Sequence, residues 1–572
     1  MTGAPADLLD GLDPEQRRAA ETLLGPVCIL AGAGTGKTRA LTHRIAYGVA
    51  TGAYDPARVL ALTFTTRAAG ELRTRLRGLG AGGVNARTFH AAALAQLNHF
   101  WPQVVGGSMP RILEGKARLL GQAAEQLRIR VDTASLRDAA AEIEWRKVRS
   151  MSIEDYALAA PSRALPPGIG AAAIVELQRA YESIKDDRRQ LDFEDVLLAT
   201  AGMLEAEPWV AEQVRERYRF LVVDEYQDVS PLQQQLLDLW LGTRTDVCVV
   251  GDASQTIYSF AGASSDYLLG FASRYPGAAV VRLETNHRSA EPVLQLANRL
   301  MRGRPGALDL VSAAGRGGEP VPEPESHDDD LAEARAVAAD IAAEISTGTR
   351  PEQIAVLYRV NSQAPQFEAA LAEAGVSTRL IGATRFFDID AVKRAMLELR
   401  SLSRTLSGDE PLWRVVSDVA RSIGWSQEAP ASSGAVRERW EALNTLVELA
   451  EQAPPQTTLA AFADDLFERQ AAQHEPTVAA VVLSTLHSAK GLEWESVHLA
   501  GLSEGLLPIS HARGLEAVDE ERRLLYVGIT RARRRLRLSW ARRGLRGQDR
   551  EPSRFLAELR TSTAGGSASS RR

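Results

Sequence analysis

The chain has 572 residues, of which 45% are hydrophobic and 24% charged, with 67 basic against 73 acidic residues and a formal net charge of −6. These values are typical of a globular protein and exclude a disordered, collagen-like or disulfide-stapled chain. The length predicts about three to five folding units, and the net charge alone gives no indication of a nucleic-acid ligand.

The composition also indicates the cellular compartment and points to individual cysteines and lysines. No apolar run approaches the roughly 20 residues of a membrane helix, and residues 1–10 lack the pattern of a signal peptide. We therefore expect a cytoplasmic protein without a membrane partner.

The two cysteines, Cys28 and Cys248, lie in apolar runs and are predicted to be buried in strands. Lysine is rare in this arginine-rich chain, so each retained lysine marks a position of interest: Lys37, Lys116, Lys147, Lys185, Lys393 and Lys490.

The first part of the chain has the pattern of an α/β fold. Short apolar, β-prone runs at 27–30 and 59–63 alternate with helical stretches, which predicts a parallel sheet. Residues 91–217 are rich in Ala, Leu, Arg and Glu, a composition typical of a helical insertion. Strand patterns resume at 220–223 and 247–250, so the first sheet is expected to continue after the insertion.

A second α/β region is predicted from about residue 281. Its expected strands are 354–357, 478–484 and 497–500, and they are interrupted by residues 388–477, which are again helical in composition. The predicted domains are 1–90 with 218–280, the helical insertion 91–217, 281–387 with 478–560, the helical insertion 388–477, and a disordered tail at 561–572.

Charge is unevenly distributed in the second half. Residues 318–333 hold seven acidic and no basic residues with three prolines, which predicts a solvated loop. Residues 521–550 hold eleven arginines against two acidic residues, and the acidic tract is expected to offset them from elsewhere on the chain.

Residues 31–38, Ala-Gly-Ala-Gly-Thr-Gly-Lys-Thr, follow a predicted strand and precede a helical stretch, which is the context of a phosphate-binding loop. The glycines allow backbone N–H groups to converge on an anion, Lys37 can reach the terminal phosphates, and the Thr38 hydroxyl can hold Mg²⁺. The strict motif begins with Gly, whereas this one begins with Ala31. A Gly-rich turn without a ligand is the alternative, and the retained lysine disfavours it.

Two carboxylates follow the predicted strand 220–223. Asp224 is placed to hold Mg²⁺, and Glu225 to orient and deprotonate an attacking water. Such a pair is by itself usually a solvated turn, but together with the phosphate loop it predicts nucleotide hydrolysis. Arg288 and Arg531 are candidates for the cations that stabilise charge on the γ-phosphate, although each alone is more simply a surface charge.

Eight segments resemble, in the family's order, the motifs of superfamily 1A DNA helicases of the UvrD, Rep and PcrA type. They are residues 12–17, 31–38, 63–69, 86–90, 224–228, 251–258, 485–494 and 520–532. The resemblance covers nearly the whole chain, and eight ordered matches are far more specific than any one of them. It implies two RecA-like parallel-sheet motor domains that close on ATP, each with a mainly helical insertion.

The resemblance also implies roles for individual residues. Gln16 and Arg39 would contact adenine, Glu493 the ribose, Gln255 would couple the γ-phosphate to DNA, and Arg288 and Arg531 would be arginine fingers. His287 stands where relatives usually carry a tyrosine that stacks on adenine. The expected nucleotide-binding set is Gln16, Gly34, Thr35, Gly36, Lys37, Thr38, Arg39, His287 and Glu493, with Mg²⁺ on Thr38 and Asp224.

A single-stranded DNA path needs aromatic faces for bases and cations for phosphates. The faces are expected from Phe64, Tyr258, Phe260 and Trp494, and the polar contacts from Arg87, His90, Arg359 and His487. Polar and small neighbours predict that Tyr258 and Phe260 are exposed. For Trp494, packing in the core is about equally expected.

Three departures from the family bear on function. Ala261 replaces an arginine of relatives, and Thr66-Arg67 replaces Asn-Lys. The insertion 388–477 is much shorter than the accessory domain that contacts duplex DNA in relatives. In this the chain is most similar to the second UvrD-type paralogue of actinobacteria, which often adds a cysteine-rich zinc region and a further helical domain. Both are absent from this sequence, which is expected to be a truncated or minimal form.

These observations predict an ATP-driven motor that moves 3′→5′ on single-stranded DNA and unwinds duplex in repair or replication, its polarity implied by the family alone. The expected partners are single strands, single-strand/duplex junctions and a repair protein. One alternative is a translocase that strips protein from DNA but unwinds poorly, and another is a nucleotide-switched DNA-binding module, against which the intact Asp224-Glu225 pair argues. A fused nuclease is disfavoured because no carboxylate-rich block follows Arg531.

Overall fold

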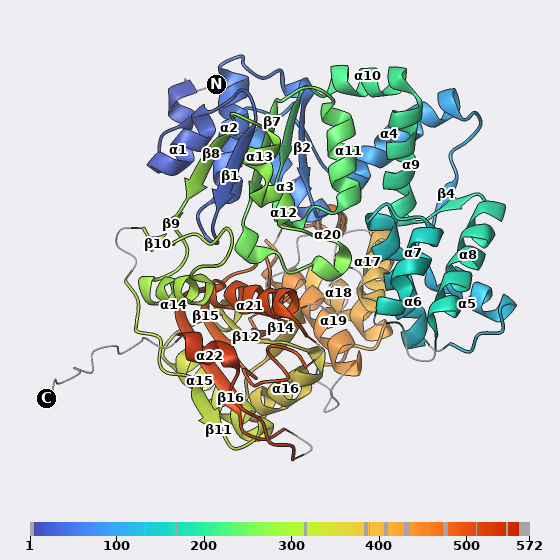
Figure 1. The fold of residues 1–572 in the computed structure, drawn as a ribbon. Helices are drawn as coiled ribbons and strands as arrows, with labels where there is room; N and C mark the ends of the chain where they lie inside the picture. Colours follow the sequence, from blue (N-terminus) through green and yellow to red (C-terminus); the bar gives the residue numbers. More distant parts are fainter. Residues whose placement is uncertain are drawn as a thin grey trace, which may run out of the picture. The chain divides into compact units, whose positions relative to one another are not determined.

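The computed structural model describes residues 5–559 apart from 132, 164, 166–168, 314–316, 382–386, 388, 405–409, 428–434, 455, 473–478, 511 and 545–546. The predicted disordered tail, 561–572, therefore lies outside the described residues. The chain divides into two compact units, Met1–Gly317 with Gly514–Tyr526, and Gly318–Arg513 with Val527–Arg572 (Figure 1).

The first unit is built on a parallel six-stranded sheet with the strand order β3-β2-β6-β7-β1-β8. The strands are β1 Val27–Ala31, β2 Val59–Thr63, β3 Asn85–Thr88, β6 Phe220–Val223, β7 Val247–Gly251 and β8 Ala279–Leu283. The four strands predicted for this sheet are confirmed to within one residue. The boundary predicted at residue 281 differs from the structure, because β8 completes the first sheet and the first unit continues to Gly317.

Both faces of the first sheet are buried, which explains why its strands are continuous apolar runs. Alternate residues of β2 pack in different cores. Leu60 and Leu62 belong to the first core, and Val59 and Ala61 belong to the second. The first core is covered by α4 Phe89–Val104, α9 Phe193–Ala206, α10 Pro208–Arg217 and α11 Pro231–Leu241, and the second by α2 Lys37–Ala50 and α3 Thr66–Gly78. Cys28 and Cys248 are free and buried in these strands, as predicted.

The first helical insertion is narrower than the predicted range 91–217. Only α5 Ala117–Gln126, α6 Thr133–Val148, α7 Ile153–Ala159 and α8 Ala171–Asp187 share a core of their own, and they lie grouped together in Figure 1. The flanking helices α4, α9 and α10 pack on the first sheet instead. An amphipathic period is the same whichever core a helix covers, so composition alone could not separate the two groups. The short strands β4 Arg111–Ile112 and β5 Gln190–Leu191 pair where the chain enters and leaves this insertion.

The rest of the first unit consists of short elements around the sheet. They are α1 Pro14–Glu21, α12 Asp266–Leu269, α13 Phe271–Arg274, β9 Thr285–Asn286, α14 Glu291–Met301 and β10 Val311–Ser312. The helix α21, Leu515–Ile529, begins in the first unit and ends in the second.

The second unit also contains a parallel six-stranded sheet, with the order β11-β16-β15-β12-β14-β13. Its strands are β11 Glu325–His327, β12 Ile354–Tyr358, β13 Thr378–Ile381, β14 Val481–Thr485, β15 Trp494–Leu499 and β16 Ala532–Ala541. The helices α15 Asp330–Ser346 and α16 Ala364–Glu373 share one core with β12 and β14, and α22 Arg554–Leu559 is the last described helix. Two parallel sheets confirm the predicted α/β class.

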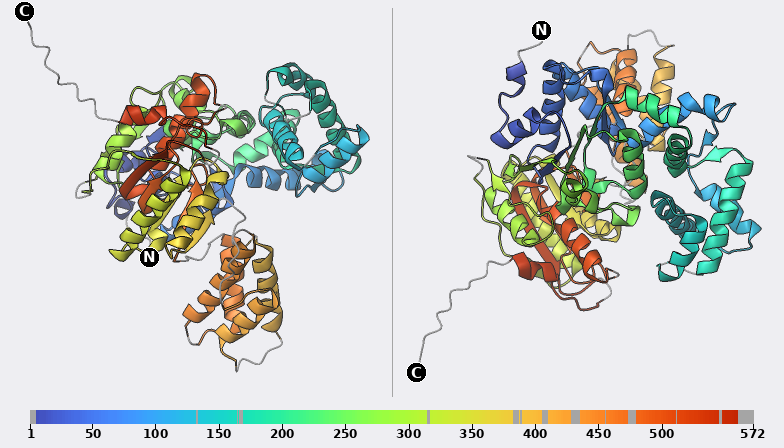
Figure 2. Two further views of the ribbon diagram at one scale, coloured as in Figure 1. Left: turned by 90° about the horizontal axis from the view of Figure 1, so that it is seen from below. Right: turned by 45° about the horizontal axis from the view of Figure 1, so that its top comes forward.

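The second insertion is a separate helical bundle, drawn in orange in Figure 2. Its helices are α17 Asp390–Leu402, α18 Leu412–Ser422, α19 Ala435–Gln452 and α20 Leu459–Ala472. They bury a common core that includes Val392, Val416, Leu443 and Leu466. The described part of residues 388–477 is therefore helical, as predicted. None of the described helices in either unit is long and apolar enough to cross a membrane.

The acidic tract 318–333 is not the solvated loop that its composition predicts. It contains β11 and the start of α15, and the side chains of Asp330 and Glu333 are buried. Glu333 accepts hydrogen bonds from the Gly501 N–H (2.8 Å) and the Ser539 hydroxyl (2.6 Å). Burial raises the pKa of Glu333 to about 7. Charge density alone did not reveal that these carboxylates have partners in the fold.

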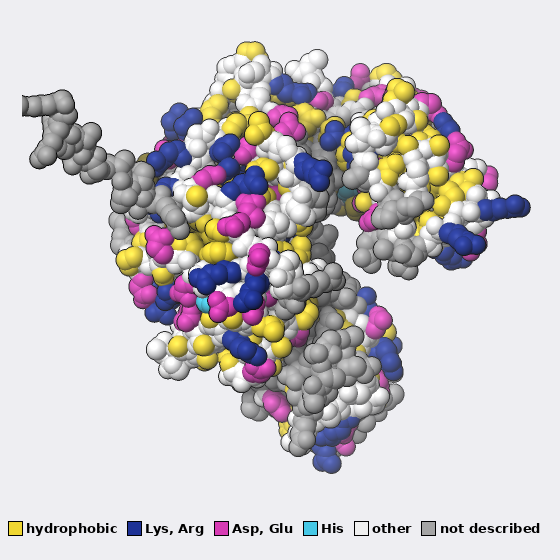
Figure 3. Space-filling model, turned by 60° about the horizontal axis from the view of Figure 1, so that its bottom comes forward, with side chains coloured by type: hydrophobic (Ala, Val, Ile, Leu, Met, Phe, Trp, Pro, Cys, Tyr) yellow, Lys and Arg dark blue, Asp and Glu magenta, His cyan; other side chains and the backbone are white. Residues whose placement is uncertain are grey.

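The basic stretch and the acidic tract pair with each other within the second unit. Ion pairs join Arg535 to Glu319 (3.1 Å), Arg542 to Asp328 (3.2 Å) and Arg550 to Asp330 (2.6 Å). The tract therefore offsets the arginines locally rather than from a distance. Because these arginines are paired, the arginine count of residues 521–550 is no measure of a DNA-binding patch. Figure 3 shows one face of the molecule, on which basic and acidic side chains are interspersed.

We expect Trp240→Ala to lower the stability of the first unit by about 3–5 kcal/mol, because it removes a fully buried ring from the core. The ring stacks on Phe89, and its indole N–H donates to Gln96 Oε1 at 2.9 Å, so truncation also leaves a buried acceptor unpaired. Chemical denaturation followed by circular dichroism measures the change. Trp413→Ala, at a half-exposed tryptophan of α18, is the control and should shift the curve little; equal shifts for both variants would contradict this packing.

Candidate nucleotide and DNA site

The candidate site of the first unit lies at the carboxyl edge of its sheet. Because all six strands run in the same direction, the segments that follow β1, β6, β7 and β8 emerge at one edge. These segments carry Lys37, Asp224, Gln255 and Arg288, respectively. The parallel sheet thus brings residues from four distant parts of the sequence together.

The segment after β1 has the geometry of an anion-binding loop. Gly34 and Gly36 have φ of +71° and +79°, a region that L side chains rarely adopt. Helix α2 begins at Lys37, and no side chain among the described residues caps it. Its first backbone N–H groups have no partner within the helix and point toward the loop, which favours an anion there.

Two buried amides hold this loop in place. Gln16 Nε2 donates to the carbonyl of Thr35 at 2.9 Å, and Asn286 Nδ2 donates to the carbonyl of Ala33 at 2.6 Å. Asn286 Oδ1 in turn accepts the backbone N–H of Arg288 (2.8 Å), so one side chain joins the phosphate loop to the segment after β8. Sequence analysis did not single out Asn286, although it directly precedes His287 and Arg288, which were predicted site residues.

An acidic centre lies beside the loop. Asp224 and Asp252 are both buried. Burial and the neighbouring Glu225 raise the pKa of Asp224 to about 7, and the Lys37 ammonium opposes this rise. Burial also raises the pKa of Asp252, again opposed by Lys37. Carboxylates in such surroundings are stabilised by a further cation, and oxygen ligands of this kind suit Mg²⁺, which usually keeps waters and substrate phosphates as its other ligands.

Glu225 has an unusual backbone conformation, with φ of +52°. A left-handed conformation is costly for a residue with a side chain and persists where the surroundings impose it. Gln227 supplies part of those surroundings: its Nε2 donates to Glu225 Oε2 at 2.6 Å, and its Oε1 accepts the Asp252 N–H at 3.0 Å. The carboxylate of Glu225 is therefore held in a fixed direction, and Gln227 is a second residue that sequence analysis did not single out.

The segment after β7 connects the acidic centre to helix α21. Gln255 Nε2 donates to Asp252 Oδ2 at 2.7 Å. Arg523 of α21 donates to the carbonyl of Thr256 at 2.7 Å, and Glu520 accepts the Ser259 N–H at 3.0 Å. A shift of this part of α21 would therefore be transmitted to Thr256, the residue next to Gln255.

The residues predicted to contact adenine differ in their exposure. Gln16 is almost fully buried, and its amide already holds the phosphate loop, so this structure shows a positioning role and no free amide for a base. His287 is 40% exposed, and its Nε2 lies 2.7 Å from Asp13 Oδ2. Exposed Arg39 donates to the carbonyl of Gly11 at 2.9 Å. The imidazole and the guanidinium thus mark the outer rim of the site.

The predicted residues of the second unit lie at opposite ends of its strands. Arg359 and His487 follow β12 and β14 at the carboxyl edge, whereas Glu493 and Arg531 precede β15 and β16 at the amino edge. Glu493 pairs with Arg533. Each unit therefore holds its own set of the predicted residues.

The predicted arginine finger Arg531 is buried in the second unit. Its guanidinium donates to the carbonyls of Val527 (2.9 Å) and Leu492 (3.1 Å) and to the Thr530 hydroxyl (3.1 Å). These bonds join the end of α21 to the segment before β15. In this structure the guanidinium is thus engaged in its own unit, and a contact with phosphate stays a prediction.

One of the DNA residues predicted for the first unit, His90, belongs to a well-defined ring pair. His90 stacks on Phe193 with ring centroids 3.8 Å apart and an interplanar angle of 14°. Burial lowers the pKa of His90 to about 4, which favours the neutral imidazole. Phe193 is 54% exposed, an unusual state for a phenylalanine stacked on a partner. Sequence analysis missed Phe193, whose only signal is an aromatic residue between acidic ones.

The other predicted DNA residues are mostly less exposed than expected. Phe64 and Arg87 are half-buried at the ends of β2 and β3. Tyr258 is half-buried rather than exposed, and burial raises the pKa of its hydroxyl to about 12. Trp494 is 6% exposed in β15, so this structure favours the core-packing alternative for that ring. The side chain of Phe260 lies outside the described residues.

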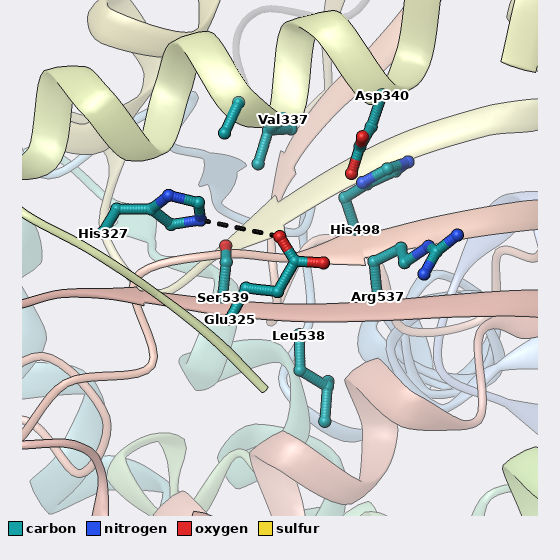
Figure 4. Close-up of a pocket in the computed structure, with 9 residues that line it drawn as sticks. Glu325, His327, Val337, Asp340, His498, Arg537, Leu538 and Ser539 are labelled. Atoms are coloured by element: carbon teal, nitrogen blue, oxygen red, sulfur yellow. Dashed lines mark ion pairs between the residues drawn. The ribbon is translucent and has the colours of Figure 1, made fainter. Parts of the chain in front are cut away.

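A small cavity in the second unit is lined by Glu325, His327 and His498 beside α15 (Figure 4). Its volume is about 10 Å³, which is about the space of one water molecule. A nucleotide does not fit this cavity.

Comparison with known families decides between the classes that this geometry allows. The model of the UvrD/REP helicase N-terminal domain matches residues 12–276, and that of the UvrD-like helicase C-terminal domain matches residues 281–431 and 426–543. The chain belongs to the UvrD/Rep helicase family. The two matched ranges meet at residues 276–281, whereas the first compact unit of the structure continues to Gly317.

The relatives place this chain nearer to one branch of the family. It is 47% identical to "ATP-dependent DNA helicase UvrD2" of Mycobacterium tuberculosis over 97% of this chain and 82% of that protein. It is 30% identical to "ATP-dependent DNA helicase PcrA" of Bacillus subtilis over 96% of this chain and 86% of that protein. It is likewise 30% identical to "ATP-dependent DNA helicase UvrD1" of M. tuberculosis, over 97% and 86%. The similarity to the second actinobacterial paralogue is thereby confirmed.

We expect Gly34→Ala to reduce ATP turnover about a hundredfold or more, the scale of effect that follows when reacting groups move by an ångström. A Cβ at Gly34 would lie 2.5 Å from Asn286 Nδ2 and 2.8 Å from Arg288 Cβ, so the clamp on the loop would have to shift. The control is Gly52→Ala, because Gly52 has a similar φ of +76° but no atom near its Cβ position. Steady-state ATPase rates are measured for both variants. Equal losses of turnover in the two variants would show that the close approach of Asn286 and Arg288 to Gly34 is unimportant.

Proposed function

We propose that this UvrD/Rep helicase is an ATP-dependent 3′→5′ translocase on single-stranded DNA that unwinds duplex DNA ahead of it in repair or replication. As a member of the family the chain is an ATP-dependent DNA helicase. The observation that carries the finer proposal is the shared carboxyl edge of the first sheet. The phosphate loop and Asp224 lie at that edge, and so do the segments after β2 and β3 with Phe64 and His90.

The hydrolytic roles follow from the positions of the acidic centre. Thr38 and Asp224 would hold Mg²⁺, which when bound neutralises charge on the phosphates. Lys37 would bind the terminal phosphates, and Glu225, oriented by Gln227, would accept a proton from the attacking water. Arg288 and Arg531 would stabilise the charge that develops on the γ-phosphate.

The coupling of hydrolysis to DNA is proposed to pass through Gln255. Its amide is bonded to Asp252, and the same segment is bonded to α21 and continues to Tyr258. The DNA would follow the rings of Phe64, Tyr258 and the His90–Phe193 pair, with Arg87, Arg359 and His487 as polar contacts. His287 and Arg39 at the rim, with Glu493, would contact the nucleoside. We expect this activity in the cytoplasm, at single-strand/duplex junctions and with a repair-protein partner.

One alternative is a translocase that displaces bound protein and unwinds poorly. It is favoured by the short second insertion, α17–α20, because the larger accessory domain is the part that contacts duplex in relatives. The alternative of a nucleotide-switched binding module is disfavoured by the fixed orientation of Glu225, which a module that only binds nucleotide would not need.

We expect Glu225→Gln to retain ATP binding but to lower the rate of hydrolysis about 10²- to 10⁴-fold, because the amide cannot accept the water's proton. The exposed Glu212→Gln of α10 is the matched control and should leave the rate unchanged. Single-turnover hydrolysis and equilibrium binding of a fluorescent ATP analogue separate the two steps. Turnover close to that of the unmodified chain would refute the assigned role.

A strand-displacement assay tests polarity and unwinding together. With ATP, we expect the chain to unwind a duplex with a 3′ single-stranded tail and to leave 5′-tailed and blunt duplexes intact. Unwinding of the 5′-tailed substrate would overturn the proposed polarity. Displacement of a bound streptavidin block without unwinding of the 3′-tailed duplex would favour the protein-stripping alternative.

A further inference from the structure

Three of the four lysines that lie outside the helicase motifs converge on one place. Lys37 and Lys490 lie in motifs, and Lys393 is exposed on α17. The other three come from different elements of the first insertion: Lys116 precedes α5, Lys147 is in α6, and Lys185 is in α8. Their side chains are 9%, 1% and 3% exposed, respectively. We call these three residues the lysine cluster.

The lysine cluster binds the first turn of α9. Lys147 Nζ lies 2.6 Å from Asp192 Oδ2, 2.7 Å from Asp195 Oδ1 and 2.9 Å from Glu182 Oε1. Lys185 also pairs with Asp195 and Glu182. Lys147 thus directs its three ammonium protons at three carboxylates. A compact ammonium suits such a site better than a planar guanidinium does, which accounts for lysine in an arginine-rich chain.

The third lysine completes the contacts with this turn. Lys116 Nζ lies 2.7 Å from Glu194 Oε2 and 2.9 Å from Glu144 Oε1. Asp192, Glu194 and Asp195 are therefore all neutralised by lysines from the insertion. Without these cations, three carboxylates packed in the first turn of one helix would repel each other in a poorly solvated place.

The residue in the middle of these three carboxylates is Phe193. Its neighbours on both sides are buried, whereas its own ring is exposed and stacks on His90. His90 lies in the first turn of α4, which packs on the first sheet, while the lysines belong to α5–α8 and the segment before them. The position of the Phe193 ring therefore depends on ion pairs between the insertion and a helix of the motor core.

We propose that the lysine cluster positions the first turn of α9 so that Phe193 and His90 form one stacked platform for DNA. This rests on the proposed function, in which that ring pair contacts the single strand. The lysines touch neither nucleotide nor DNA in this role. They act through Phe193, and they make the affinity for DNA dependent on how the first insertion is joined to the motor core.

The test compares Lys116→Met, Phe193→Ala and the double variant of the full chain. ATPase is measured against oligo-dT concentration, which yields the half-saturating DNA concentration and the rate at saturation. Phe193→Ala should raise the half-saturating concentration about tenfold, as expected for loss of one stacked base. Lys116→Met should raise it severalfold while the saturated rate stays near that of the unmodified chain, and the double variant should be no worse than Phe193→Ala alone.

Several outcomes would overturn the proposal. Multiplied effects in the double variant would show that Lys116 acts independently of Phe193, and an unchanged half-saturating concentration in Lys116→Met would show that it does not act at all. Lys147→Arg keeps the charge and is expected to weaken DNA activation like Lys116→Met, with circular dichroism as the check on folding. Lys393→Met is the control and should change neither quantity. Absence of any oligo-dT stimulation in the unmodified chain would instead contradict the proposed function.

Discussion

The direction of the strands is the constraint on which the rest of the first unit depends. Six parallel strands place every following segment at the same edge, so residues separated by more than 200 positions become neighbours there. Asn286 shows the consequence, because it follows β8, the strand paired with β1, and holds the phosphate loop although it lies 253 residues away in the sequence. The same edge carries the ends of β2 and β3, where the sequence predicts DNA contacts. In the proposed function, nucleotide and DNA would therefore both contact this one sheet edge.

Buried charge is the second theme of this structure. At the phosphate loop, Asp224 and Asp252 share the field of Lys37, and burial raises the pKa of both carboxyls. Such a centre favours a bound cation. At the first insertion the carboxylates are instead neutralised by the lysine cluster, and in the second unit the acidic tract pairs with arginines. The first kind of site is available for a ligand, whereas the other two fasten parts of the fold to each other.

The sequence predicted the sheets and the motifs better than the roles of single side chains. Strands buried on both faces are apolar runs bounded by turns, and 59–63 and 220–223 were therefore predicted to the residue. Helices were recognised, but the core that each one covers was not, because α4 and α9 have the same period as α5–α8. Contacts between residues distant in the sequence could not be predicted either. Gln16 was predicted to read adenine, whereas in the structure its amide holds the phosphate loop. The arginine partners of the acidic tract lie about 200 residues away from it in the sequence. Phe193 was missed because nothing local distinguishes an exposed platform from a buried ring.

The central claim is that the nucleotide state and DNA binding are coupled through the shared edge of the first sheet. The most direct measurement is the equilibrium affinity of the full chain for oligo-dT, with and without a non-hydrolysable ATP analogue and Mg²⁺. Coupling between two ligands typically changes affinity by about 5- to 150-fold, and we predict a change of at least fivefold that disappears in Gly34→Ala. Equal affinities in the presence and absence of the analogue would contradict the claim, since a ligand that binds both states equally drives no movement.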